Sequence, residues 1–407
     1  MNAIAPGFGC ALGGMPFEDA LQRVLGLVWE SLATEEVALE ACVGRTSGSA
    51  VAARLDLPGF DQSAMDGYAV CSAGLTPGMW LPVTGRTAAG EAPAKLAPGS
   101  AHRILTGAPM PQGADVVIAQ ENLVRTGDVV EVAAVPPAGT NVRRKGEDIR
   151  AGQTLVVQGT VLDWRHIAVL AAQGLQFVSV RQRPRVVLLS NGRELRGAGD
   201  NLAPGQIHDS NLPMLTTLLQ SWGAEIHPHP IVADDAPSMR VALCAAAEDA
   251  DLVMTTAGIS VGDEDHVRDA VEALGGNLAV LKVAMKPGKP LAAGRLGRAV
   301  FIGLPGNPMA ALAGAVAFVR PLLARMAGVP PPRMIRAYVN FELRRKPGRT
   351  EFIPVRLRQR EACRWAERAG PDGSGRLSPL LAADGLAVIP ADEADIRPGR
   401  LLEVLAL

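Results

Sequence analysis

The sequence predicts a multidomain protein of the α/β plus β class. It combines a parallel-sheet α/β domain, an inserted β-rich domain, a mixed helical domain and a C-terminal small β domain. The chain of 407 residues is longer than one hydrophobic core normally spans. Short β-branched runs broken by Gly and Pro fill residues 46–145, and apolar strands alternate with amphipathic helices over residues 181–330.

Composition limits the class of partner and the compartment. Hydrophobic residues make up 48% and charged residues 20%, and the formal net charge of −1 lacks the basic excess typical of nucleic-acid-binding proteins. Five cysteines without a CxxC pair favour a reducing compartment. The N-terminus lacks a signal-peptide pattern, and the apolar run Met309 to Val319 is shorter than the roughly 20 residues of a membrane span. We expect a cytoplasmic protein with a small-molecule partner, no nucleic acid and no membrane.

The N-terminal half predicts one domain inserted into another. Residues Phe17 to Val28 have helical apolar spacing, with acids early in the helix, and Trp164 to Gly174 have the same periodicity and end at Gly. The β-rich stretch lies between them. We therefore expect residues 46–145 to be inserted between the segments 1–45 and 146–180 of one mixed helical domain.

The next 150 residues alternate strand and helix, which is typical of βαβ units in a parallel sheet. Three predicted strands end in polar or Gly-rich loops, with the sequences LSNGREL, TTAGISVGDEDH and GLPGNP. Ligands of such sheets bind beyond the carboxyl ends of the strands, so we expect these loops to meet at one crevice. Short strands with Pro and Gly turns over residues 331–407 predict the C-terminal β domain.

One loop of the β-rich stretch is unusually polar. The sequence LPGFDQSAMDGYAV, residues 57–70, contains Asp61 and Asp66 within a short run. Unpaired carboxylates are costly to bury, so a buried strand is an unsuitable interpretation. This loop is predicted to belong to a site.

The crevice loops predict anion and cation binding. The Gly-bearing turn before a helix starting near His266 offers backbone N–H groups to a phosphate, although GxGxxG and GxxxxGK[ST] fingerprints are missing. Glu194 and Asp265 lie on two of these loops and are predicted to bind a divalent cation such as Mg²⁺. The alternative is that the acids of this turn only favour a helix N-terminus.

The run KVAMKPGKPL contains Lys282, Lys286 and Lys289. Its Pro and Gly residues predict a rigid turn, whose lysines would face a multiply charged anion. The alternative is a set of ordinary surface lysines. His227 and His229 match no standard zinc spacing.

The polar loop of residues 57–70, which contains PGFDQSAMDGYAV, occurs together with five other motifs. They are RILTGAPMPQGADVVIAQE, RRKGEDI, TTAGISVGDEDH, MKPGKP and GLPGNP. In this order, over nearly the whole chain, the motifs resemble the molybdopterin molybdenumtransferase family of MoeA-type proteins, which is similar also to the gephyrin E domain. The resemblance implies that residues 181–330 form a molybdopterin-binding domain. It implies an elongated homodimer with each active site between the α/β domain of one subunit and the β-rich domain of the other.

The implied reaction inserts molybdate into the dithiolene of adenylylated molybdopterin (molybdopterin-AMP), with Mg²⁺-dependent release of AMP. Molybdopterin adenylyltransferase and molybdoenzyme apoproteins are the expected protein partners. The resemblance implies catalytic roles for Asp61, Thr106 and Asp148 of the β-rich segment and for Glu194, Asp234 and Asp265 of the α/β segment.

Further residues match substrate-binding positions by resemblance. They are Ser63, Asp66, Arg143, Gly258, Ser260, Gly262, Lys282, Lys286, Lys289, Pro290, Pro305, Pro308 and Arg349. The turn at Lys286, Lys289 and Pro290, together with Arg349, resembles the part of the family that holds molybdate. On this interpretation the polar loop docks against a neighbouring subunit's crevice, so its acids need no partner within their own domain.

Several positions depart from the family pattern. Asn191, Gly192, Arg193 and Glu194 stand where TGDE is usual, so a cation replaces a carboxylate. Gln62 replaces Asn, Ala257 the first Gly of a pair, and Ala310 a Ser. Two hypotheses therefore stand: an active molybdenum insertase, and a catalytically weak or silent paralogue that acts as a cofactor carrier or scaffold. A mononucleotide enzyme outside this pathway is the third, and it leaves the polar loop unexplained.

Overall fold

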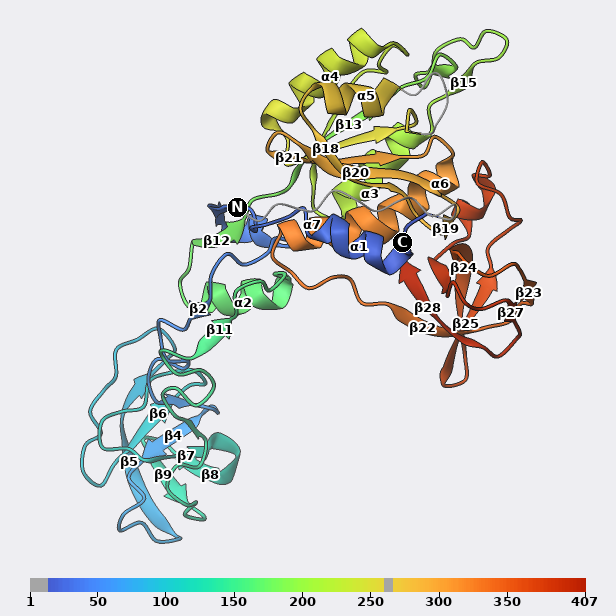
Figure 1. The fold of residues 1–407 in the computed structure, drawn as a ribbon. Coiled ribbons are helices and arrows are strands. Elements are labelled where there is room, and N and C mark those ends of the chain that lie inside the picture. The colour runs from blue at the N-terminus through green and yellow to red at the C-terminus, as the bar shows by residue number, and fades with distance from the viewer. Residues whose placement is uncertain (1–13, 260–265) are drawn as a thin grey trace.

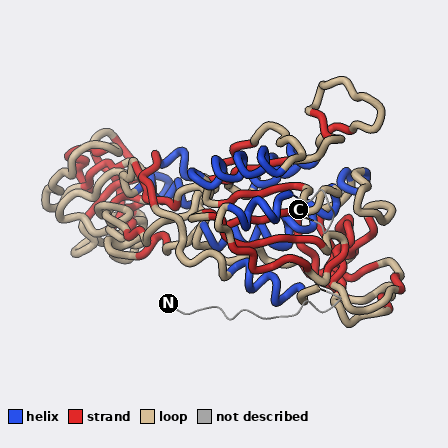
Figure 2. The backbone as a smooth tube through the Cα atoms, turned by 45° about the horizontal axis from the view of Figure 1, so that its top comes forward, coloured by secondary structure: helices blue, strands red, loops and turns tan. Residues whose placement is uncertain are grey.

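The computed structural model describes residues 14–259 and 266–407. The predicted combination of α/β and β domains is confirmed. Figure 1 shows the β-rich sheet at one end of an elongated molecule, with the α/β domain and the C-terminal β domain packed together at the other. Figure 2 shows the same arrangement, with most helices between two strand-rich regions.

The β-rich domain is built on a six-stranded sheet with the order β7-β4-β6-β5-β9-β8. Its buried core contains Tyr68, Leu81 and Ile118. A separate two-stranded pair joins β3 to β10 beside this sheet. The strands are β3 (Gln62–Ser63), β4 (Gly67–Val70), β5 (Met79–Thr87), β6 (Ala101–Ile104), β7 (Val116–Ala119), β8 (Leu123–Thr126), β9 (Val129–Val132) and β10 (Val142–Arg143), with the 3-10 turn η2 (Gln120–Asn122) after β7.

Strands from before and after this sheet pair with each other. Strand β1 (Thr34–Ala38) is antiparallel to β12 (Phe177–Arg181), and β2 (Val51–Ala52) is antiparallel to β11 (Thr154–Val156). The 3-10 turn η1 (Leu39–Cys42) and helix α2 (Trp164–Ala172) complete this unit. The β-rich sheet is thus inserted between two segments of the chain that pair with each other to form one small unit.

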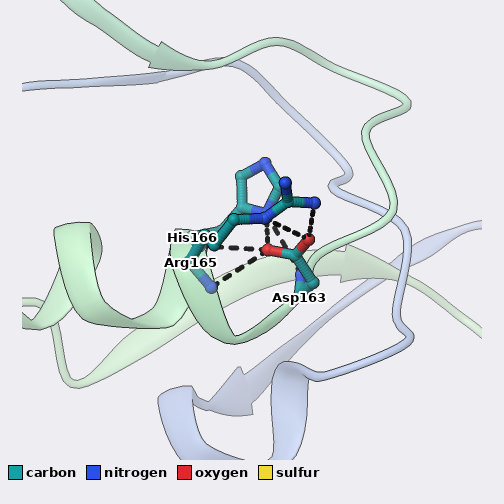
Figure 3. Close-up of polar contacts among 3 residues, drawn as sticks. All are labelled: Asp163, Arg165 and His166. Carbon is teal, nitrogen blue, oxygen red and sulfur yellow. Dashed lines mark hydrogen bonds and ion pairs between the residues drawn. The ribbon is translucent and has the colours of Figure 1, made fainter.

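Helix α2 begins at a strong N-terminal cap. The Asp163 carboxylate accepts hydrogen bonds from the backbone N–H groups of Arg165 and His166, and the His166 ring bonds back to Asp163 (Figure 3). Hydrogen bonds from the Arg165 guanidinium hold the pKa of Asp163 well below its ordinary value. The capped end fixes where the helix starts. The predicted helix at Trp164 is confirmed.

Helix α1 (Phe17–Leu25) confirms the predicted N-terminal helix, which ends a turn earlier than expected. Its Phe17 ring meets Phe318 and Phe352 edge to face, with centroid distances of 5.3 Å in both pairs. Such contacts stabilise a core beyond simple burial. This early segment therefore packs into the core of the α/β domain.

The α/β sheet has the order β16-β13-β17-β21-β20-β18. The predicted parallel arrangement holds for β16, β13, β17 and β21, whereas β20 and β18 are antiparallel. A two-residue turn joins β20 to β21, and the seven-residue segment 283–289, which includes β19, joins β18 to β20. Parallel neighbours would need a longer crossover. The strands are β13 (Arg185–Ser190), β16 (Glu225–Pro228), β17 (Leu252–Thr256), β18 (Asn277–Lys282), β20 (Pro290–Leu296) and β21 (Ala299–Leu304).

Helices cover both faces of this sheet (Figure 1). Successive strand residues enter opposite cores: Leu188 packs with α1, α3 and the α6 to α7 segment, and Leu189 packs with α4 and α5. The helices are α3 (Asn211–Ser221), α4 (Ala236–Asp249), α5 (His266–Ala273), α6 (Pro308–Gly314), the π-helical η3 (Ala315–Val319) and α7 (Arg320–Met326). The short strands β14 (Leu195–Arg196) and β15 (Ile207–His208) flank a loop that stands away from the body (Figures 1 and 2).

The continuous helical segment Pro308–Met326 is apolar because it fills the core. By length and composition its 19 residues could cross a membrane, but 78% of this apolar stretch is buried within the protein. This burial is typical of the central helix of a globular core.

The C-terminal β domain is a small barrel. Strands β24, β25, β22, β28 and β26 follow one another, and pairing of β24 with β26 closes the ring. The strands are β22 (Ile335–Val339), β24 (Thr350–Arg360), β25 (Cys363–Arg368), β26 (Gly385–Ile389) and β28 (Leu401–Ala406), with the outer pair β23 (Leu343–Arg344) and β27 (Asp395–Ile396) and the 3-10 turn η4 (Ser378–Leu381). Strand β19 (Met285–Lys286), which belongs to the α/β segment, adds to the barrel beside β24.

Candidate functional site

A cavity of about 350 Å³ lies where the α/β domain meets the barrel. The turn 285–290, the loop after β21, the start of β24 and the loop 371–374 form its walls. Its charged lining side chains are Lys286, Lys289, Arg349, Glu351 and Asp372. The cavity therefore carries a small excess of positive charge, as expected for an anion site.

The turn that carries the lysines is fixed by its local sequence. Gly288 has φ +101°, a conformation that favours glycine, and a Cβ added there would lie 3.3 Å from the carbonyl oxygen of Ala310. Pro287 and Pro290 restrict the backbone on either side. Lys286 and Lys289 both line the cavity, and the anion that they are predicted to face stays a prediction.

A carboxylate that the sequence did not reveal lies beside Lys286. Parallel pairing of β19 and β24 places Lys286 opposite Glu351, and the Lys286 Nζ to Glu351 Oε2 distance is 3.3 Å. Behind it, Arg345 Nη1 lies 3.4 Å from Glu351 Oε1. The side chains of Glu351 and Arg345 are only 7% and 4% exposed, whereas that of Lys286 is 52% exposed. Glu351 thus connects a buried cation to a cavity cation.

The carboxyl ends of the parallel strands form a second polar region. Ser190 Oγ lies 3.1 Å from Thr256 Oγ1, and Asn211 Nδ2 donates to the Gly306 carbonyl at 2.6 Å. Within the described part of the chain, four buried oxygen atoms at these strand ends and around the first residue of α3 have no hydrogen-bond partner: Asn191 Oδ1, Asp209 Oδ2, Asn211 Oδ1 and Thr255 Oγ1. Buried polar atoms normally have partners, so this edge of the sheet is suited to a polar ligand.

Gly258 lies at the same edge with φ +69°. A Cβ there would lie 2.5 Å from Val267 Cγ2, so only glycine fits. Ala257 has φ +74°, although it carries a Cβ. A left-handed alanine stores about 1 kcal/mol or more of backbone strain, and sites that bind ligands commonly hold such strain.

Arg193 faces a predicted catalytic carboxylate in this crevice. Its Nε lies 3.8 Å from Asp234 Oδ2, and the Asp234 side chain is 11% exposed. Glu194 follows on the same loop and is exposed. Among residues 14–259 and 266–407, no group of three His, Cys, Asp or Glu side chains is arranged to hold a metal ion. Asp265, Ser260 and Gly262 lie outside the described residues.

The polar loop of the β-rich domain has partners within its own domain. Asp61 accepts from Arg144 Nη1 at 2.6 Å and from the Lys145 backbone N–H at 2.8 Å. The hydrogen bond from the Lys145 backbone, followed by that from Arg144, lowers the pKa of Asp61. The expectation that this acid needs no partner in its own domain is therefore wrong: the hairpin-like return of the chain at 144–145 supplies two donors.

The same correction applies to Asp66. The backbone N–H and the hydroxyl of Thr106 both donate to its Oδ1 at 2.7 Å, and these bonds lower the pKa of Asp66. Ser63 is fully buried and donates from Oγ to the Met65 carbonyl at 2.6 Å. The loop is thus rigid and ionised before any ligand or subunit arrives.

The predicted site residues fall into three groups. The first group is Asp61, Ser63, Asp66, Thr106 and Arg143 of the β-rich domain, with Asp148, whose backbone N–H donates to the Leu57 carbonyl of the polar loop. The second group, at the strand-end crevice, is Glu194, Asp234 and Gly258, and the third, at the cavity, is Lys286, Lys289, Pro290, Pro305 and Arg349. Pro308 begins α6 next to the cavity, and Lys282 is partly buried at the end of β18. In one chain the β-rich group lies far from the other two (Figure 1).

Sequence reasoning missed Glu351, Asp372, Arg345 and Arg144. Arg144 lies in the motif RRKGEDI beside the predicted Arg143, and Glu351 lies two residues after the predicted Arg349. Their roles depend on partners 83 and 65 residues away in the chain. Only the tertiary arrangement reveals such pairs.

The fold and the site define a multidomain protein whose α/β domain shares a cavity lined by three cationic side chains with a C-terminal barrel. Family models match the chain in three consecutive parts: "MoeA N-terminal region (domain I and II)" over residues 15–174, "Probable molybdopterin binding domain" over 197–325, and "MoeA C-terminal region (domain IV)" over 336–407. These parts follow the order of the domains described above.

Whole-chain relatives agree. The chain is 35% identical to molybdopterin molybdenumtransferase 2 of Mycobacterium tuberculosis, covering 94% of this chain and 97% of the relative. It is 35% identical to the molybdopterin molybdenumtransferase of Nostoc sp., covering 92% and 89%. The solved structure of the molybdopterin biosynthesis MoeA protein of Pyrococcus horikoshii superposes with a TM-score of 0.85 at 31% identity, covering 97% of this chain and 99% of that one. The chain belongs to the molybdopterin molybdenumtransferase (MoeA) family.

Proposed function

We propose that this protein is a molybdenum insertase of molybdenum cofactor biosynthesis. It would transfer molybdate into the dithiolene of adenylylated molybdopterin, and AMP would be released. The observation that carries the proposal is the cavity with Lys286, Lys289 and Arg349, because fixed cations around a compact space suit an oxyanion. Relatives named molybdenumtransferases support the transfer reaction.

The pterin substrate is assigned to the strand-end crevice. Its unpartnered buried oxygens and the left-handed glycine turn at 258 offer polar contacts and close backbone approach. Ligands of α/β sheets bind at this edge. Arg193, which lies beside Asp234, would donate to the adenylyl phosphate, and Glu194 follows it on the same loop.

The described carboxylates do not by themselves make a metal site, so no chemical step is assigned to Mg²⁺. Mg²⁺ dependence stays a prediction that involves Glu194 and Asp265, as made from the sequence. Asp265→Asn should leave pterin binding intact and reduce Mg²⁺-stimulated AMP release. An unchanged rate and an unchanged Mg²⁺ response would reduce Asp265 to a helix-capping acid.

We propose further that the active form is a homodimer with shared sites. The β-rich group and the crevice lie apart in one chain, so a second subunit would bring them together (Figure 1). The unit that joins the β-rich domain to the rest also exposes large apolar side chains, with Val157 at 62%, Trp164 at 74% and Phe177 at 52% exposed. Exposed apolar side chains are typical of an isologous contact.

The decisive experiment incubates the purified protein with molybdopterin-AMP, molybdate and Mg²⁺ and follows AMP release. Release that requires molybdate supports the insertase. Binding of all ligands without release favours the second candidate, a silent carrier that delivers cofactor to apoproteins. The observation that favours this candidate is the guanidinium of Arg193 beside Asp234. In that case Arg193→Asp should restore AMP release. Cytoplasmic location and the partner proteins stay predictions.

A further inference from the structure

The anion cavity contains negative charge as well as positive charge. Its lining includes three cationic side chains, Lys286, Lys289 and Arg349, but also the carboxylates of Glu351 and Asp372. The net charge of the lining is therefore one positive charge, less than a dianion needs for neutralisation. A carboxylate in the wall of an oxyanion site places like charges side by side, which costs binding energy.

The position of Glu351 makes it the stronger of the two counter-charges. It is 6% exposed, and its two oxygens face Lys286 Nζ at 3.3 Å and Arg345 Nη1 at 3.4 Å. Because the carboxylate is buried, solvent screens its charge less than that of an exposed acid, although Arg345 on its other side offsets part of that charge. Asp372, which is 61% exposed and pairs with Arg368 at 2.8 Å, lies where solvent weakens its field.

We propose that Glu351, assisted by Asp372, is a built-in counter-charge that weakens oxyanion binding so that the anion can leave for the acceptor. The inference rests on the proposed function, since it concerns the same cavity and a dianionic substrate such as molybdate. Glu351 shares the Lys286 ammonium with the incoming anion and repels that anion directly. Tight ground-state binding does not speed a transfer, so moderate affinity serves turnover.

Two effects of removing this charge oppose each other. Glu351→Gln frees Lys286, whose ordering against the anion becomes less favourable, and it also removes one unit of repulsion beside a dianion. The entropy cost of ordering the Lys286 side chain is small, whereas the repulsion between a buried carboxylate and a nearby dianion is large. The loss of repulsion therefore outweighs the loss of Lys286 ordering, and the Glu351→Gln variant should bind the anion more tightly. A purely structural carboxylate would give unchanged or weaker binding.

The test is titration of the full-length protein with sodium molybdate by calorimetry. We expect Glu351→Gln to lower the Kd about tenfold and Asp372→Asn to lower it about twofold, and added salt should shrink both gains. The matched control is Glu393→Gln, which removes the same charge from an Arg400 pair in the barrel region and should leave the Kd unchanged. The double variant Arg345→Gln/Glu351→Gln removes the buried guanidinium together with the Glu351 carboxylate, so the net charge beside the cavity is unchanged. Its Kd for molybdate should therefore return to near the wild-type value.

Each outcome decides the matter. A wild-type protein that binds no molybdate overturns the proposed function and this inference together. A wild-type protein that binds, with a Glu351→Gln variant that binds no more tightly, overturns the inference alone. If Glu351→Gln fails to fold because Arg345 is left unpaired, Asp372→Asn decides: binding tighter than in the Glu393→Gln control supports the counter-charge, and equal binding overturns it.

Discussion

The cavity at the barrel junction and the polar loop of the β-rich domain both combine acids with cations, but the balance is reversed. At the cavity, Lys289 and Arg349 are exposed and line an open space of about 350 Å³. In the loop, Asp61 and Asp66 already accept two hydrogen bonds each from their own domain. The cavity is therefore built to receive a ligand charge, and the loop is built to present charges in fixed positions.

The contrast shows two ways of preparing a polar site. The side chains of Lys289 and Arg349 have no hydrogen-bond or ion-pair partner within the described residues, so their donors stay available to an anion. The carboxylates of Asp61 and Asp66 are held in place by donors of their own domain, and their lowered pKa values keep them ionised when another subunit binds. The following predictions test this division.

The largest effect should come from mixing two inactive variants. If the loop completes a partner's crevice, Asp61→Ala and Glu194→Ala dimers that exchange subunits form hybrids with one intact site. An equal mixture should then recover roughly a quarter of wild-type AMP release from a near-zero background, because half of the dimers are hybrids. The measurement is AMP release before and after exchange. Activity that stays at the level of the separate variants contradicts shared sites.

Removing one cavity cation should have the next largest effect. Lys286→Ala should weaken molybdate binding by about tenfold or more and pterin binding much less, because a fixed cation contributes most to a compact dianion. Equilibrium binding of both ligands measures this. Lys346→Ala is the control, since Lys346 is exposed and outside the cavity lining. Equal losses for both ligands would remove Lys286 from the molybdate site.

The stability of the β-rich domain against unfolding should depend on pH through His102. Its ring is 4% exposed, lies 2.7 Å from Thr87 Oγ1 through Nε2, and burial lowers its pKa below the ordinary 6.5. The unfolded chain therefore binds a proton more readily, and the domain should lose stability as pH falls below 6.5. Chemical denaturation at several pH values should show a weaker pH dependence for His102→Gln. An identical slope for both proteins would assign the effect to other groups.

The smallest effect is expected from Arg144, the cation that pairs with Asp61 of the loop. Arg144→Ala removes the Asp61 ion pair, whose side chains are 54% and 38% exposed. The free energy of unfolding should fall by less than about 1 kcal/mol, because exposed pairs contribute little. Molybdate affinity should stay unchanged, in contrast to Lys286→Ala. A clear loss of molybdate binding would mean that the loop cations also serve the anion and would end the distinction between the two regions.

Local patterns in the sequence predicted the elements and the lysine turn well. The Pro and Gly residues around Lys286 determine the turn without help from distant parts of the chain, and helices α1 and α2 follow from periodicity. The partners were not predictable. The contact of Glu351 with Lys286 depends on the register of β19 with β24, and the bonds of Asp61 depend on the return of the chain at Arg144. The antiparallel edge of the sheet likewise depends on connection length rather than on residue type.

Strand β19 has a consequence for chimaeric proteins. Only Met285 and Lys286 form it, yet their ladder partners Thr350 and Glu351 lie in the barrel. A barrel transplanted from a relative would bring its own β24 and meet a foreign two-residue edge. Modular exchange should therefore succeed only when the segment 285–290 travels with the barrel, so that the unit of recombination is larger than the domain seen in the fold.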